Sequence, residues 1–230
     1  MKKTKGFSQE WEKQYSSNSS QSQWPWADLI SLVHRFTNIS KNSLDVLELG
    51  CGYGANIPLF IKNNANYFGI DGSKYVINDL KSRFKKTKHI NLKQADFTKK
   101  IPFNKKFDLI FDRGSLTCNQ TLDIKKTITL IDNHLKKGGV FIGVDWFSIK
   151  HSEYKRKDAI NIDKYTLDSF NSGVFKDLGH IHFTSKKQLK KLFKDFNILY
   201  IEHKTSKQEF PNSNFLGAAF NFVVSKKNKN

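Results

Sequence analysis

The chain has 230 residues, a length that fits one ordinary domain or one domain with a sizeable insertion, and 38% of its residues are hydrophobic. This composition is globular, and a chain of this length buries a core without disulfide or metal staples. It has two cysteines, Cys51 and Cys118, and neither a secretory leader nor a run of about 20 apolar residues is apparent. We therefore expect a cytoplasmic protein without a membrane span or a disulfide framework.

The net charge is +18, from 39 basic and 21 acidic side chains, and such an excess is typical of proteins that bind nucleic acids. Only four of the basic residues are arginine, the residue that base readers and phosphate clamps favour because its planar fork bonds bidentately. The frequent Lys, Asn and Ile also match an AT-rich coding sequence. The charge alone therefore leaves open whether it serves an anionic partner or reflects coding bias.

The first 23 residues are polar and predict a flexible arm or a lid, and residues 24–230 predict one domain. Apolar periodicity in that domain predicts, in chain order, a helix after Pro25, a strand at 44–49, a helix at 56–62, a strand at 66–70, a helix after Ser73, strands at 90–95 and 107–111, a helix through 124–135, a strand at 140–144, a helix after Ser185, and strands at 198–201 and 215–224. This alternation predicts a doubly wound, mostly parallel α/β sheet with helices on both faces. A more polar segment at 147–183 interrupts it and is interpreted as an insertion.

The most informative segment is Asp45-Val46-Leu47-Glu48-Leu49-Gly50-Cys51-Gly52-Tyr53-Gly54. An apolar strand is followed by glycines at every second position, which let the backbone turn tightly and approach a ligand. The loop lies at the carboxyl end of a strand, where open α/β sheets bind ligands. With Ala55 it also satisfies the dinucleotide fingerprint, but Glu48 before the first glycine disfavours a pyrophosphate. A cationic ligand end, such as an amino group or a sulfonium, is favoured instead.

This segment resembles motif I of the class I S-adenosylmethionine-dependent methyltransferases of the small-molecule type. Four further segments resemble that family's later motifs, in order, within residues 44–145: Ile70-Asp71-Gly72-Ser73, Gln94-Ala95-Asp96-Phe97, Phe107–Asp112 and Leu135-Lys136-Lys137-Gly138-Gly139. The resemblance implies a Rossmann-like sheet of seven strands, mostly parallel, with the last strand antiparallel.

The resemblance also implies S-adenosylmethionine as the methyl donor and S-adenosylhomocysteine as the product. Glu48 would lie near the methionine portion, Asp71 would accept hydrogen bonds from the ribose diol, and Asp96 would accept one from the adenine amino group. Each carboxylate alone is equally consistent with a cap or a solvated loop residue, so the ordered set carries the interpretation. The residues expected to contact the cofactor are Glu48, Gly50, Cys51, Gly52, Asp71, Gly72, Ser73, Asp96, Phe97 and Asp112.

Methyl transfer from a sulfonium is an in-line displacement, so the enzyme mainly positions the acceptor, although an aliphatic hydroxyl also needs a base. His182 is the first candidate for that base and His180 the second, because strand alternation would place both on one side. Asp112 is a third candidate, as a base or as the group that orients one. A structural role stays open for each. No metal site is expected, because the histidine pair has no nearby cysteine or clear carboxylate partner.

Four residues are candidates for acceptor binding: Arg113, Trp146, Tyr154 and Trp26. Arg113 would hold an anionic group, unless it forms a structural pair with Asp112. Trp146 ends the fifth strand and Tyr154 lies in the insertion. Trp26 would fold over the donor or pack in the core. The Asp112-Arg113-Gly114 segment resembles thiopurine-type methyltransferases over too few residues to identify a substrate.

The favoured function is O-methylation of a small anionic acceptor, such as a nucleotide-linked sugar or a polysaccharide precursor. The alternative is an RNA or protein methyltransferase that uses the basic surface. The fourth strand, however, leads into Asp112-Arg113-Gly114-Ser115 and not into the Asn/Asp-Pro-Pro-aromatic motif common in amino-directed nucleic-acid members. A binding module without activity is a third hypothesis, and the complete set of donor motifs argues against it. The acceptor atom and the oligomeric state stay open.

Overall fold

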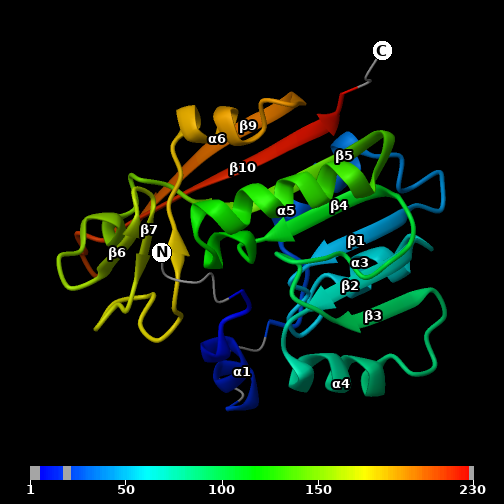
Figure 1. Cartoon of the computed structure of the whole chain (residues 1–230), viewed down its shortest axis with the longest axis horizontal. Helices are drawn as coiled ribbons and strands as arrows, with labels where there is room; N and C mark the ends of the chain where they lie inside the picture. The colour runs from blue at the N-terminus through cyan, green and yellow to red at the C-terminus, as the bar shows by residue number, and fades with distance from the viewer. Residues whose placement is uncertain (1–5, 18–21, 228–230) are drawn as a thin grey trace.

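The computed structural model describes residues 6–17 and 22–227. Its centre is a seven-stranded sheet in the order β3-β2-β1-β4-β5-β10-β9 (Figure 1). The strands are β1 (Asp45–Leu49), β2 (Asn66–Asp71), β3 (Ile90–Gln94), β4 (Phe107–Arg113), β5 (Leu135–Phe147), β9 (Phe196–Lys207) and β10 (Leu216–Lys226). Strands β1 to β5 are parallel, whereas β10 is antiparallel to both β5 and β9. The predicted Rossmann-like sheet with an antiparallel last strand is confirmed.

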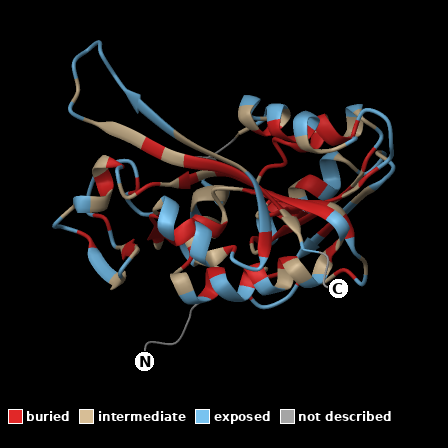
Figure 2. Cartoon of the chain, turned by 90° about the horizontal axis from the view of Figure 1, so that it is seen from above, coloured by how far each residue is buried: buried red, intermediate tan, exposed pale blue. Residues whose placement is uncertain are grey.

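Helices cover both faces of this sheet because neighbouring strand residues point to opposite sides. Val46 of β1 packs in the core under α2 (Ala27–Phe36), α3 (Ile57–Lys62) and α4 (Lys74–Arg83), and the adjacent Leu47 packs under α5 (Thr121–His134) and α6 (Lys186–Leu192). Figure 2 shows the buried sheet between its exposed helix faces. The helices predicted after Ser73 and Ser185 are present, and these two residues cap them: the Ser73 hydroxyl accepts from the Val76 N–H and that of Ser185 from the Gln188 N–H, each at 3.1 Å.

Two further units lie beyond the carboxyl ends of the parallel strands (Figure 1). One is α1 (Gln9–Ser16), which contacts α4; the rest of the predicted arm includes residues 1–5 and 18–21, which lie outside the described residues. The other lies within residues 147–183 and contains the 3₁₀ helix η2 (Ser152–Lys155) and a sheet of β6 (Ile160–Asp163), β7 (Thr166–Asp168) and β8 (Ile181–His182). A short 3₁₀ helix, η1 (Leu116–Cys118), follows β4 and contacts β8. These units surround the edge of the sheet that carries the glycine-rich loop.

Within the described part of the chain, no helix combines the length and the apolar character that a membrane crossing requires. Cys51 and Cys118 are both free thiols. Residues of the 147–183 segment have an apolar core of their own, which includes Phe170, Phe175 and Phe183. This separate core makes the segment a compact wall at the carboxyl edge of the large sheet.

Candidate active site

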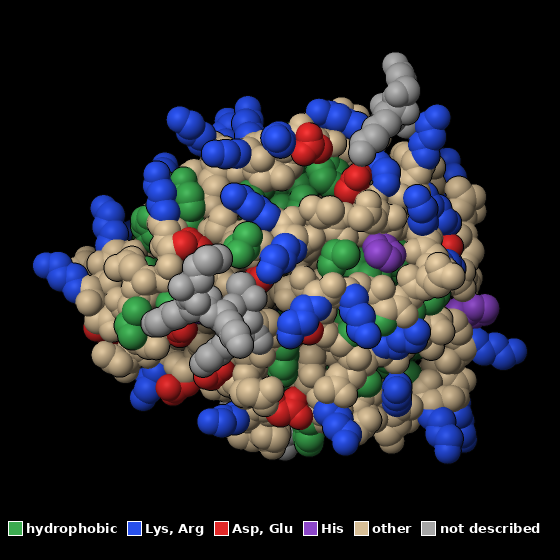
Figure 3. All heavy atoms as spheres, viewed as in Figure 1, with side chains coloured by type: hydrophobic (Ala, Val, Ile, Leu, Met, Phe, Trp, Pro, Cys, Tyr) green, Lys and Arg blue, Asp and Glu red, His purple; other side chains and the backbone are tan. Residues whose placement is uncertain are grey.

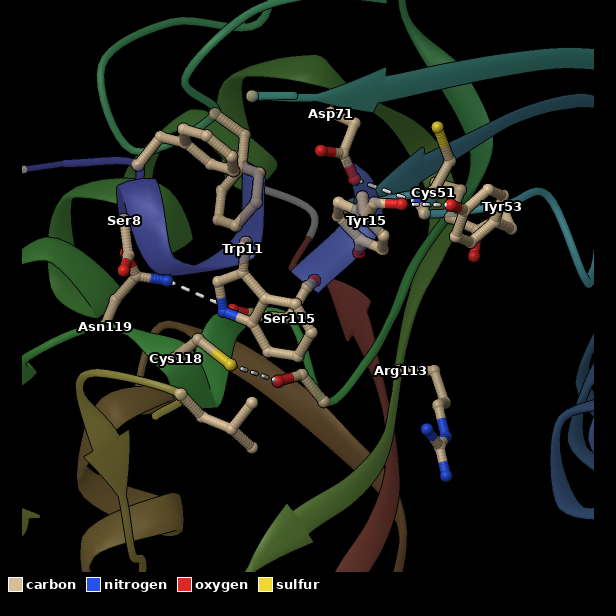
Figure 4. A pocket seen from close by; sticks show the side chains of 18 of the residues that line it. Ser8, Trp11, Tyr15, Cys51, Tyr53, Asp71, Arg113, Ser115, Cys118 and Asn119 are labelled. Atoms are coloured by element: carbon tan, nitrogen blue, oxygen red, sulfur yellow. Dashed lines mark hydrogen bonds between the residues drawn. The ribbon is translucent and has the colours of Figure 1, made fainter. Parts of the chain in front are cut away.

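A cavity of about 320 Å³ lies at the carboxyl ends of the parallel strands. Its walls come from α1, the loop after β1, the ends of β2 and β3, the segment after β4, and the 147–183 segment (Figure 4). The lining residues at the ends of β1, β2 and β3, and in the loops that follow these strands, are here called the donor half. The lining residues from β4 onward, together with Trp11 and Trp26, are called the acceptor half. The volume lies at the small end of the range for ligand pockets.

The loop after β1 approaches the cavity so closely that two positions require glycine. Gly50 has φ +71° and Gly52 φ +47°, in the left-handed region that residues with a Cβ rarely adopt. The Gly50 N–H donates to the Ile70 carbonyl oxygen at 2.8 Å, which ties the loop to β2. A Cβ on Gly50 would lie 2.3 Å from the Ser115 Cβ, and one on Gly52 would lie 3.2 Å from the Tyr15 hydroxyl. The loop therefore presents backbone to the cavity.

Asp71 ends β2 and joins this loop to the next helix. One carboxylate oxygen accepts from the Gly52 N–H at 2.9 Å, and the other accepts from the Ser73 N–H at 2.9 Å. The side chain is buried, and burial raises its pKa to about 6 despite these hydrogen bonds. Asp71 and the following Gly72 line the cavity, whereas Ser73 caps α4 and does not. Asp71 is therefore available to a polar ligand at the end of β2.

Asp96, after β3, lines the cavity beside the N-terminal segment. One oxygen accepts from the Thr98 N–H at 3.0 Å; the other accepts from the Phe7 N–H and pairs with the Lys99 ammonium, each at 3.1 Å. Burial acts to raise the pKa of Asp96, but hydrogen bonds from Thr98 and Lys99 prevail and lower it below its usual value. The Phe7 ring lies over Gly72, where a Cβ would come within 2.1 Å of it. Residues 6–17 therefore close directly over the donor half.

Glu48, near the end of β1, is 2% exposed. It accepts hydrogen bonds from the Asn56 side-chain amide at 2.7 Å and from the Tyr67 hydroxyl. Burial raises the pKa of Glu48 to about 8. At neutral pH the protonated form therefore predominates, and the side chain holds the start of the loop while still lining the cavity. The predicted cofactor residues that line this one cavity are Glu48, Gly50, Cys51, Gly52, Asp71, Gly72, Asp96 and Phe97.

Asp112 does not line the cavity, which corrects its expected position as a cofactor contact or a base. It is fully buried, and burial raises its pKa to about 6. The Trp146 indole N–H donates to one carboxylate oxygen at 2.6 Å. The other accepts from the Ser115 hydroxyl at 2.8 Å and from the Leu116 N–H at 2.7 Å. Asp112 therefore anchors the segment after β4 and is closed off from the cavity by its own partners.

The two candidate histidines also lie away from the cavity. His182 is fully buried; its ring nitrogens lie 2.9 Å from the Thr166 hydroxyl and 3.1 Å from the Gln188 amide nitrogen, and burial lowers its pKa to about 4. The His180 Nε2 lies 3.3 Å from a carboxylate oxygen of Asp168. The residue between them, Ile181, lines the cavity. Alternation along β8 therefore has the opposite phase to the one expected, and it turns both histidines away from an acceptor.

The same phase difference occurs at the end of β5. Trp146 is fully buried, and its indole N–H donates to Asp112. Its neighbour Phe147 lines the cavity. Trp146 is thus a core residue and not an acceptor contact. Tyr154 also lies off the cavity, with its hydroxyl 3.1 Å from the Lys164 carbonyl oxygen. At this wall of the cavity, Phe147 occupies the position that the sequence had suggested for Trp146.

Arg113 and Trp26 do line the cavity, and they contact each other. The guanidinium carbon lies 3.6 Å from the centre of the Trp26 ring, within cation–π distance. Arg113 pairs with Asp145 at 2.9 Å and not with Asp112, the alternative that the sequence left open. Asp145 itself has φ +56°, which turns its side chain out of the β5 alternation. Arg113 is held by two neighbours at the border of the acceptor half.

Several lining residues escaped the sequence interpretation. Trp11 and Tyr15 reach the cavity from α1, and the Tyr53 hydroxyl donates to the Tyr15 carbonyl oxygen at 2.5 Å (Figure 4). Their only signal was the presence of large aromatic residues in a polar segment. Cys118 and Phe175 also line the cavity. Burial raises the pKa of the Cys118 thiol to about 12, so it stays protonated.

Comparison with known proteins identifies the class. A family model described as a methyltransferase domain matches residues 21–203, well over half of the chain. The chain therefore belongs to this methyltransferase family. The predicted class I S-adenosylmethionine-dependent methyltransferase is confirmed, and S-adenosylmethionine is the cofactor of that class. No curated protein matches the sequence significantly.

Solved structures share the fold at low sequence identity. An S-adenosylmethionine-dependent methyltransferase from Methanosarcina mazei aligns with TM-score 0.70 and 16% identity, over 90% of this chain and 100% of that one. The N-methyltransferase NodS from Bradyrhizobium japonicum, in complex with S-adenosylhomocysteine, aligns with TM-score 0.62 and 13% identity over 95% and 100%. A 1,6-didemethyltoxoflavin-N1-methyltransferase from Burkholderia thailandensis gives 0.65 and 12% over 94% and 85%. Likeness at these identities shows the fold alone.

Proposed function

We propose that the chain transfers a methyl group from S-adenosylmethionine to a small molecule held in the cavity. The observation that carries this proposal is the convergence of Glu48, Asp71 and Asp96, from three neighbouring strand ends, on a loop whose glycines leave room for a ligand. When bound, S-adenosylmethionine supplies a methyl group activated by its sulfonium. Asp71 would accept from the ribose diol and Asp96 from the adenine amino group. Residues 6–17 would exclude water from above.

The acceptor atom would have to be nucleophilic without help from His180, His182 or Asp112, the bases that the sequence suggested. Among the described residues that line the cavity there is no histidine, and Asp112 lies behind its own partners. An ionised hydroxyl, an amine or a ring nitrogen meets this requirement, whereas a sugar hydroxyl does not. We retain O-methylation, restricted to a hydroxyl that is acidic enough to ionise near neutral pH. N-methylation is the second candidate, supported by the lack of a histidine among the described lining residues and by the fold shared with N-methyltransferases.

An anionic group on the acceptor is supported by Arg113. It is the one cation among the described lining residues, and its side chain is 34% exposed. Its pairing with Asp145 neutralises part of the charge, so it suits one carboxylate or phenolate better than a diphosphate. An acceptor with a single negative charge therefore fits this wall.

An RNA or protein acceptor would favour a continuous basic surface around the cavity. Figure 3 shows Lys and Arg side chains spread over the visible face of the molecule and interspersed with acidic and neutral surface. The cavity itself, in the described part of the chain, is lined by more carboxylates than cations. We therefore base the proposal on a small molecule and treat the lysine excess as a general surface property.

The test is incubation of the purified chain with methyl-labelled S-adenosylmethionine and three sets of acceptors: phenolic or enolic acids, heterocyclic amines, and nucleotide-linked sugars. Mass spectrometry of the products should show one added methyl group on a member of the first or second set. Transfer to nucleotide-linked sugars alone would contradict the requirement for a self-ionising acceptor. Failure of the chain to bind S-adenosylmethionine would contradict the proposed function as a whole.

A further inference from the structure

The acceptor half has a lining that differs from the donor half in chemistry. Its side chains are mainly aromatic and aliphatic and come from four separate parts of the chain: Trp11, Trp26, Phe147, Phe175, Leu178 and Ile181. Figure 4 shows Trp11 beside Cys118 and Asn119, across the cavity from Asp71 and Cys51. A ligand in this half therefore meets ring faces, ring edges and methyl groups on most sides.

The polar groups of this half are mostly engaged within the protein. The Ser115 hydroxyl lies 2.8 Å from an Asp112 oxygen and also contacts the Leu49 carbonyl. The Asn119 amide nitrogen lies 3.1 Å from the Ser115 carbonyl oxygen and 3.3 Å from that of Leu116. A polyhydroxylated acceptor would bury hydroxyl groups against this wall without enough partners, which is costly. The wall therefore selects against sugars.

The apolar wall is rigid, because a second layer of rings supports it. Phe147 and Phe175 pack edge to face with ring centres 4.7 Å apart. Behind them His151 lies 5.2 Å from the Phe175 ring, and burial lowers its pKa to about 4, which keeps it neutral. Phe183 is fully buried in the same cluster. A wall of fixed rings suits a flat ligand, which offers aromatic faces and edges for stacking.

The shape and charge of the ligand sharpen this selection. A planar ring system fills a narrow apolar space with little conformational entropy to lose. A nucleotide-linked sugar has more volume, more hydroxyl groups and at least one more charge than Arg113 can serve.

We infer that the acceptor is a planar aromatic or heteroaromatic small molecule, bound among the lining side chains of Trp11, Trp26, Phe147, Phe175 and Ile181. This inference rests on the proposed function, because it assigns the substrate class of the same cavity. Trp26 is its specificity-determining residue: it lines the cavity, and the Arg113 guanidinium stacks on its ring. An aromatic acid would meet the rings with its flat body and Arg113 with its carboxylate.

The test is a calorimetric titration of the full-length chain, saturated with S-adenosylhomocysteine, with three probes. Naphthalene-2-carboxylate is planar and anionic, cyclohexanecarboxylate has the same charge without a flat ring, and uridine diphosphate glucose is a nucleotide-linked sugar. We expect naphthalene-2-carboxylate to bind at least tenfold more tightly than either of the others. Equal or tighter binding of uridine diphosphate glucose would overturn the inference.

Matched variants assign the binding to the cavity. Trp26→Ala should weaken naphthalene-2-carboxylate binding at least tenfold, and Trp26→Phe should restore most of it. Trp24→Ala is the control, because Trp24 is 75% exposed and does not line this cavity. Unchanged binding in Trp26→Ala would overturn the assignment. The proposed function fails by a different result, namely absence of S-adenosylhomocysteine binding to the wild-type chain before any probe is added.

Discussion

The two halves of the cavity differ in how they are built. The donor half comes from strand ends that are adjacent in the sheet, and its polar groups are fixed by the backbone: Asp71 accepts from two backbone N–H groups and the loop from Gly50 is tied to β2. The acceptor half is assembled from α1, Trp26, the segment after β4 and residues 147–183, and it is mainly apolar. The strand ends that form the donor half have fixed positions in the sheet, which suits the binding of one invariant ligand. The connecting segments that form the acceptor half can change, and with them the substrate specificity, without a change in the sheet.

Damage to the donor half should weaken donor binding more than any change in the acceptor half. Asp71→Ala removes a charged acceptor and releases the Gly52 and Ser73 N–H groups. Charge-assisted hydrogen bonds contribute about 1.5–3 kcal/mol each, so we expect the Kd for S-adenosylmethionine to rise about 100-fold. Isothermal titration calorimetry measures this change. Asp79→Ala is the matched control, because Asp79 pairs with Arg83 on the surface of α4; an equal effect in both variants would contradict the assignment.

A change in the acceptor half should leave the donor half intact. Arg113→Gln removes the cation that lines the cavity and its pairing with Asp145. We expect KM for an anionic acceptor to rise about tenfold, as for loss of one partly exposed charge-assisted hydrogen bond, and donor affinity to change less than twofold. Initial rates at varied acceptor and fixed saturating donor separate the two effects. A rise in donor Kd equal to the rise in KM would remove the distinction between the halves.

His182 lies in neither half of the cavity, so its substitution should affect stability and not catalysis. His182→Ala leaves the Thr166 hydroxyl and the Gln188 amide without a buried partner, so we expect a loss of about 2–3 kcal/mol of unfolding free energy. The kcat of the folded fraction should change less than twofold. Urea denaturation and single-turnover rates, both corrected for folded protein, give the two quantities. A fall in kcat of about 100-fold or more would instead identify His182 as the general base.

Glu48 should make the stability of the fold depend on pH. Its folded-state pKa of about 8 lies above the usual 4.5, so between these values the folded chain holds a proton that the unfolded chain has lost. Unfolding free energy should therefore decrease as pH rises from about 5 to 8. Glu48→Gln cannot ionise and should show a shallower decrease in the same denaturation series. Equal slopes in the two proteins would rule out Glu48 as the cause.

The sequence indicated that Glu48, Asp71 and Asp96 lie together at one edge of the sheet, because each belongs to a short motif that ends a strand, and the cavity brings them together. Their contact with the cofactor stays a prediction. The sequence used strand alternation to orient His180 and His182, but a period does not define which neighbour faces the cavity. At β8 the inward residue is Ile181 and not His182, and at β5 it is Phe147 and not Trp146. The phase at β5 follows from a long-range contact, the bond from the Trp146 indole to Asp112. Such partners lie far apart in the sequence, so no local pattern reveals them.

The contribution of α1 was hidden for a related reason. Trp11 and Tyr15 lie in a polar segment without a buried residue of its own, so nothing in the segment indicates that these rings face a ligand. Their packing depends on the loop that contains Gly52 and Tyr53. A surface created only when the whole sheet has folded gives no signal in the segment that covers it.

Equilibrium dialysis of the wild-type chain against labelled S-adenosylmethionine tests the central claim most directly. We predict saturable binding of one equivalent per chain, displaced by S-adenosylhomocysteine because both ligands would share the ribose and adenine contacts proposed for Asp71 and Asp96. Absence of saturable binding, or binding that S-adenosylhomocysteine does not displace, would contradict it.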